Sequence, residues 1–109
     1  MTEQQRARIL EWIAYHRETQ IRLYRDPEAA PMRAEMHRVV CEALQKVLSG
    51  ELLGSQAEAW FLQQMEPMKA YVSLGKDAGM QWVLEMAYRC QCEDGARYVA
   101  SNLREALER

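Results

Sequence analysis

The sequence predicts an all-α fold, a compact bundle of about five helices in one domain that spans residues 1–109. Apolar residues recur at helical spacing along most of the chain, and no segment alternates apolar and polar residues over the length of a strand. Only five glycines and three prolines occur, and they separate the stretches with helical period. A chain of 109 residues has the size of a single domain.

A long N-terminal helix is expected from about Glu3 to Arg25. Thr2 and Gln5 can form a capping box at its start, in which each side chain accepts a hydrogen bond from the backbone of the other residue. Asp26-Pro27 should end the helix, because the residue before a proline avoids the helical region of backbone conformation. Both ends of this helix are thus predicted by local signals.

The second and third helices are predicted from their apolar stripes. The second starts near Pro31 and ends before Gly50. Its stripe consists of Met32, Met36, Val39, Val40, Ala43, Leu44 and Val47. The third starts with a capping box formed by Ser55 and Glu58. Its apolar residues keep one phase across Pro67, which predicts a kinked or closely stacked pair of helical segments rather than a reversal of the chain.

The fourth helix is expected to be the central one. Asp77 can cap it, and its apolar arc is very wide, with Met80, Trp82, Val83, Leu84, Met86, Ala87, Tyr88 and Cys90. A helix that is apolar on most sides is expected to be buried. The fifth helix covers about 96–107, and its apolar stripe lies nearly half a turn out of phase with the fourth. This mismatch, with Asp94-Gly95 between the two stripes, predicts a break.

Composition and charge exclude several classes of function. The formal net charge is −2 and no cluster of Lys and Arg occurs, so binding to the phosphate backbone of nucleic acid is not expected. No apolar run approaches the length of a membrane span, and the polar N-terminal stretch does not look like a secretory signal. The three cysteines are an odd number and do not suggest a disulfide framework, so we expect a cytoplasmic protein.

The cysteines and His37 are candidate residues for a chemical site. His37-x-x-x-Cys41 and Cys90-x-Cys92 supply four side chains that could bind a soft metal such as zinc. Structural zinc sites usually use Cys-x-x-Cys pairs, so we expect structural thiols and no metal or cofactor. A catalytic Cys–His pair would need a third, orienting group and an oxyanion site, and no phosphate-binding glycine loop occurs, so an enzyme is not expected. A metal- or thiol-dependent protein that uses Cys41, Cys90 and Cys92 remains the alternative.

The first helix carries polar residues on a face that should be buried. His16 and Gln20 continue an apolar line with the four-three spacing of a helix pair, and a buried amide needs a hydrogen-bond partner. That partner belongs either to another helix of the same chain or to another molecule, including a second copy in a homodimer. Trp12 and Tyr15 lie beside this face and either widen the buried arc or bind a partner. The candidate partner-binding residues are Ile9, Trp12, Ile13, Tyr15, His16, Gln20 and Leu23.

The stretch EWIAYHRETQIRLYRDPEAAPM, the Cys90-x-Cys92 segment, the small size and the helical layout resemble the anti-activator proteins of pseudomonad quorum sensing, the QslA type. The resemblance implies a protein that binds the acyl-homoserine-lactone-binding domain of a LuxR-type regulator, blocks its dimerisation and so weakens its hold on DNA. It carries no individual residue over to this chain. We therefore expect a protein-binding inhibitor of a transcriptional regulator, with a small helical chaperone or a toxin-immunity protein as the alternatives.

Overall fold

The computed structural model describes residues 1–25, 31–75 and 77–108. Over these residues the chain forms four α-helices and one 3-10 helix, and no strand. The elements are α1 (Glu3–Arg25), α2 (Pro31–Leu48), α3 (Gly54–Met65), the 3-10 helix η1 (Glu66–Leu74) and α4 (Ala78–Leu107). The predicted all-α fold is confirmed. The predicted number of helices is not, because the expected fourth and fifth helices are one continuous helix.

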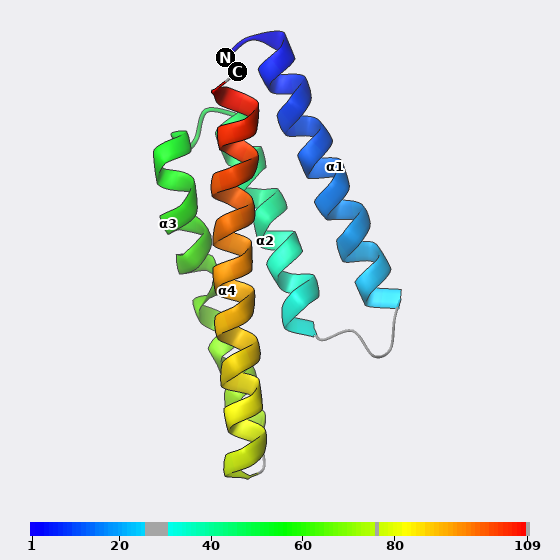
Figure 1. The fold of residues 1–109 in the computed structure, drawn as a ribbon, viewed down its shortest axis with the longest axis vertical. Helices are drawn as coiled ribbons and strands as arrows, with labels where there is room; N and C mark the ends of the chain where they lie inside the picture. Colours follow the sequence, from blue (N-terminus) through cyan, green and yellow to red (C-terminus); the bar gives the residue numbers. More distant parts are fainter. Residues whose placement is uncertain (26–30, 76, 109) are drawn as a thin grey trace.

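α1 and α2 lie side by side as an antiparallel pair with the predicted bounds (Figure 1). The predicted capping box is present at the start of α1: the Thr2 N–H donates to Gln5 Oε1 at 2.8 Å, and the Gln5 N–H donates to Thr2 Oγ1 at 3.1 Å. Gln5 Nε2 also donates to the Leu107 carbonyl at 3.1 Å, which joins the two ends of the chain. The Asp26-Pro27 dipeptide lies outside the described residues.

α2 is the central helix of the bundle. It packs against α1, α3 and α4. Its buried residues are Met32, Ala34, Met36, His37, Val39, Val40, Cys41, Ala43, Leu44 and Val47. Residues 77–90, which were predicted to form the fourth helix, are all exposed or half-buried, so the prediction that this helix would be central is wrong.

The starts of α4 and α3 differ in how well local sequence predicts them. At α4, Asp77 Oδ1 accepts a backbone N–H of the first turn at 2.8 Å, so the predicted cap is confirmed. At α3, the helix begins one residue before Ser55, and Gln56 Oε1 accepts the Leu53 N–H at 3.0 Å. The predicted Ser55–Glu58 capping box is therefore wrong, because the helix starts earlier than that pair requires.

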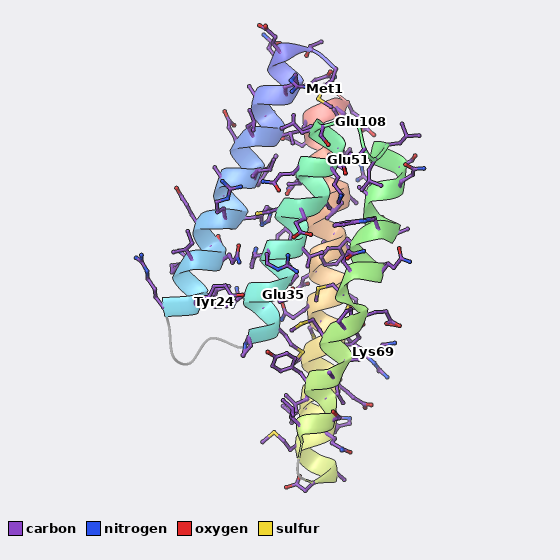
Figure 2. The ribbon with its side chains drawn as sticks, turned by 180° about the vertical axis from the view of Figure 1, so that it is seen from behind. Met1, Tyr24, Glu35, Glu51, Lys69 and Glu108 are labelled. Atoms are coloured by element: carbon purple, nitrogen blue, oxygen red, sulfur yellow. The ribbon has the colours of Figure 1, made fainter. Side chains whose placement is uncertain are left out.

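α3 and η1 follow each other along one side of α4, and the geometry changes from α to 3-10 at Glu66 (Figure 2). Pro67 lies at the start of η1 and has no N–H to donate, so it interrupts the α-helical hydrogen bonds there. Phe61, Met65 and Met68 remain buried on both sides of the change. The predicted stacking of two helical segments across Pro67 is confirmed.

α4 runs without a break from Ala78 to Leu107, although an interruption was predicted at Asp94-Gly95. Gly95 is buried where α4 packs on α3, and a Cβ at this position would lie 2.0 Å from Cζ of Phe61. The glycine therefore permits a close approach of two helices and does not end one. The predicted fifth helix is the second half of α4.

The first half of α4 and η1 project beyond the ends of α1 and α2 (Figure 1). We call this projection, formed by η1 and residues 78–90 of α4, the arm. The molecule measures 51 × 27 × 19 Å and its radius of gyration is 14.9 Å, whereas a compact domain of this length has about 13 Å. In Figure 2, Glu35 marks the start of α2 and Lys69 lies on η1, from which the arm continues away from the bundle. Among the described helices, none has the length and apolar character that crossing a membrane requires.

Candidate functional site

The structure divides the predicted partner-binding residues of α1 into two groups. Ile9, Ile13 and His16 are buried in the core of their own chain, where α1 packs on α2 and α4. The predicted seam with another molecule is therefore wrong for these three residues. Trp12, Gln20 and Leu23 are half-buried, and Tyr15 is exposed.

His16 finds its hydrogen-bond partners within the chain, on two other helices. Its Nδ1 lies 3.0 Å from Nδ1 of His37 on α2, and its Nε2 lies 2.8 Å from Oδ1 of Asn102 on α4. The amide oxygen can only accept, so His16 Nε2 carries the proton and donates it. Nδ1 of the neutral His16 ring is then the acceptor, and Nδ1 of His37 donates to it. The network joins α1, α2 and α4.

Burial keeps both histidines of this network neutral. The pKa of His16 is lowered by burial. The pKa of His37 is lowered to about 4, mainly by burial and also by the nearby His16, Arg33 and Arg22. If both rings were protonated, two N–H groups would face each other at the Nδ1 atoms. The network is therefore a structural junction between three helices.

Asn102 is the member of the network that the sequence analysis did not single out. It lies in phase with the buried residues Val99, Leu103 and Ala106 of α4. A polar residue on the inward face of a helix, such as Asn102 on α4 or His16 on α1, indicates a buried hydrogen bond. The signal was available in the sequence, but it did not identify which residue the side chain would bind.

Trp12 is bound to α4 on the outer side of α1. Its indole N–H donates to Oε2 of Glu105 at 2.8 Å, and Arg8 Nε donates to Oε1 of the same carboxylate at 2.7 Å. The Arg8 guanidinium also lies 4.9 Å from the centroid of the Trp12 ring. Trp12 packs against the core as well. It thus widens the buried arc of α1, which is one of the two alternatives that the sequence left open.

Trp12→Phe should destabilise the fold by about 1 kcal/mol, because the ring remains but the hydrogen bond to Glu105 is lost. Trp12→Ala should cost more, about 2 to 3 kcal/mol, because apolar contact with the core is also lost. Urea unfolding followed by circular dichroism measures both values. Equal effects of the two substitutions would contradict the packing role that the structure gives to the ring.

The cysteines lie in three different environments. Cys41 is buried, its Sγ–H donates to the Ile13 carbonyl at 3.5 Å, and burial raises its pKa to about 11. This thiol stays protonated at neutral pH and is a poor nucleophile. Cys92 is half-buried and Cys90 is exposed. Over the described residues, no three His, Cys, Asp or Glu side chains gather in a way that could hold a metal ion.

The most distinctive surface of the molecule is on the arm. Four large apolar side chains of α4 are exposed there: Trp82 (62%), Val83 (53%), Met80 (51%) and Met86 (42%). We call these four residues the apolar face. The sequence predicted that they would be buried, and this is wrong: η1 packs against α4, and the side chains of this half of the helix that are partly buried are those on the opposite side, such as Leu84 and Tyr88.

The apolar face has sharp limits along α4. Between Asp77 and Glu85 the helix carries no charged side chain. Beyond Cys90 the same exposed side of the helix carries Glu93 and Arg97. At its edge, a hollow of about 320 Å³ lies between η1 and α4 and is lined by Lys69, Val72, Glu85, Tyr88 and Arg89. The apolar face is thus bordered along α4 by charged residues.

Comparison of the chain with known protein families, with curated proteins and with solved structures gives no match.

Proposed function

We propose that this protein is a protein-binding inhibitor and that the apolar face of the arm is its binding surface. The exposure of Trp82, Val83, Met80 and Met86 on one projecting helix is the observation that supports the proposal. These side chains expose about 400 Å² together, which is the size of the largest apolar patch on a typical small protein, and such patches are often functional. Leu74 (67%) and Tyr71 (37%) are exposed on η1 of the same arm, whereas other exposed apolar residues, such as Tyr24, lie on α1.

The composition of the face suits a protein partner. Trp and Met are enriched at the centres of protein interfaces, and charged residues are depleted there. Trp82 is the most exposed of the four side chains, and a tryptophan that enters a partner's pocket is the typical residue with a large share of the binding energy. A projecting helix can also reach into a groove without a clash between the two globular bodies.

We propose a LuxR-type transcriptional regulator as the partner, bound through its acyl-homoserine-lactone-binding domain. This partner class is implied by the resemblance of the sequence to the quorum-sensing anti-activators. Binding of the arm to the dimer surface of that domain would keep the regulator monomeric and weaken its hold on DNA. In this function the protein acts in the cytoplasm and contacts neither nucleic acid nor membrane itself.

Trp82→Ala should weaken binding to the purified ligand-binding domain of such a regulator by at least about 30-fold, the effect expected of an interface tryptophan. Its free energy of unfolding should change by less than about 0.5 kcal/mol, because the side chain is exposed. Isothermal titration calorimetry measures the affinity.

Tyr24→Ala is the matched control. Tyr24 is 60% exposed and lies at the end of α1, away from the arm. This variant should bind the regulator domain as the wild type does. Equal losses in the Trp82 and Tyr24 variants would show that the arm is not the binding surface. Absence of binding by the wild type would remove the regulator as the partner.

A further inference from the structure

We infer that, in the free protein, the apolar face of the arm pairs with the same face of a second copy, as two antiparallel α4 helices. The inference rests on the proposed function in one respect, namely that this face is a protein-binding surface. It goes further by naming the occupant of the face when no other partner is present. Three observations favour a second copy: the order of residues along the face, the charges that flank it and its area.

The exposed side of the arm helix has the four-three-four spacing of a helix-pairing seam. Gly79, Val83, Met86 and Cys90 lie along one exposed line of α4. An antiparallel second copy places Met86 opposite Val83 and Cys90 opposite Gly79. Each layer therefore combines a larger side chain with a smaller one, and the symmetry repeats each layer on the other side of the twofold axis.

The flanks of this line are also complementary to themselves. In the antiparallel register, Trp82 of one copy lies beside Arg89 of the other, and a guanidinium on an indole ring is a favourable contact. On the other flank, Met80 lies beside the small Ala87 of the second copy. No charge is brought into the centre of the interface, because Gly79, Val83, Met86 and Cys90 are uncharged and Glu85 and Arg89 lie off this line.

The continuation of the exposed line decides between antiparallel and parallel pairing. Beyond Cys90 the line carries Glu93 and Arg97, which are both exposed. In a parallel pair, Glu93 of one copy would face Glu93 of the other, and Arg97 would face Arg97, so like charges would meet. In the antiparallel pair they lie past the start of the partner's α4. Because the arm projects beyond α1 and α2, the two arms can overlap while the two bundles stay apart (Figure 1).

The area of the face predicts a dimer of moderate affinity. The four apolar side chains with their flanking residues can bury about 600 Å² on each copy, which corresponds to the smaller specific protein interfaces. We therefore expect a dissociation constant in the micromolar range, about 1 to 100 µM. Binding of another protein to the same face would compete with self-association.

Sedimentation of the full chain tests the inference. From about 1 µM to about 500 µM the wild type should change from monomer to dimer. Val83→Glu should raise the dissociation constant by at least about 30-fold, because it places a carboxylate in the apolar centre. The matched control Tyr24→Glu puts the same charge at an equally exposed apolar site on α1 and should leave the dimer intact. A wild type that stays monomeric, or equal losses in both variants, overturns the inference.

Disulfide trapping tests the register. In a Cys90→Ser/Cys92→Ser background, which retains the buried Cys41, single cysteines are introduced as Val83→Cys and as Met86→Cys. A mixture of the two chains should form the mixed disulfide faster than either chain alone forms its own, because Val83 faces Met86 of the second copy. Mass spectrometry separates the three products. Faster self-linking of the single variants would indicate parallel pairing and overturn the antiparallel inference.

Titration with the regulator domain separates this inference from the proposed function. A chain that dimerises but does not bind that domain supports the dimer and removes the proposed function. A chain that stays monomeric yet binds the domain with an affinity that depends on Trp82 overturns the dimer and retains the proposed function.

Discussion

Gly95→Ala should destabilise the protein by about 2 kcal/mol, although alanine is the better helix former by about 1 kcal/mol. The new Cβ would lie 2.0 Å from Cζ of Phe61 and 2.8 Å from Cγ of Met36. Phe61 and Met36 are both buried in the core, so neither can move into solvent. α3 and α4 would have to separate, and overpacking of this kind typically costs 1 to 3 kcal/mol, occasionally more.

Urea unfolding of the Gly95 variant measures this loss, and Gly54→Ala is its control. At Gly54 a Cβ would meet only Cδ1 of Leu107, at an ordinary 3.5 Å. The Gly54 variant should therefore be close to the wild type in stability. Combining Gly95→Ala with Phe61→Leu should cost less than the sum of the two single changes, because the shorter side chain leaves space for the new methyl group. A Gly95 variant more stable than the wild type would contradict the close approach of α3 and α4.

The same glycine shows why the sequence predicted a break in α4 that does not exist. The inward face of α4 keeps one phase through Leu84, Tyr88, Gly95, Val99, Asn102 and Ala106. Two residues on this inward face, Gly95 and Asn102, are not large apolar residues. On the arm, by contrast, the outward side of α4 is apolar. A prediction that treats apolar residues as inward therefore follows the wrong side of the helix over the arm and the right side after it. The apolar stripe therefore lies on the outward side of α4 in the arm and on the inward side in the second half of the helix. This change of side is what looks like a change of phase in the sequence.

Local signals, by contrast, predicted much of the fold. The Thr2–Gln5 capping box and the Asp77 cap depend only on residues three positions apart, and both are present. The candidate site depends on tertiary contacts and could be predicted only in part. His16 was expected to need a polar partner, but its two partners, His37 and Asn102, lie 21 and 86 positions away. No pattern within one helix can identify them.

The His16–His37 pair should make the protein sensitive to mild acid. The pKa of His37 is lowered to about 4 by burial and by the positive charge of Arg33 and Arg22, whereas an unfolded chain has the ordinary value of 6.5. The unfolded chain therefore binds a proton before the folded one does. Stability is fully present above pH 6.5 and is lost as the pH falls towards 4. His37 alone should account for a loss of about 2 kcal/mol between pH 7 and pH 5.

His16 adds to this loss in the same direction, because burial lowers its pKa as well. Urea unfolding of the wild type and of His37→Gln, at pH 7 and at pH 5, isolates the effect of His37. The glutamine amide can still donate to His16 Nδ1 but does not titrate, so the variant should lose less stability than the wild type over this range. Acidic side chains contribute equally to both proteins and cancel in the comparison. If the two proteins lose the same free energy of unfolding from pH 7 to pH 5, His37 is not held neutral in the folded state, and the proton positions assigned to the network are wrong.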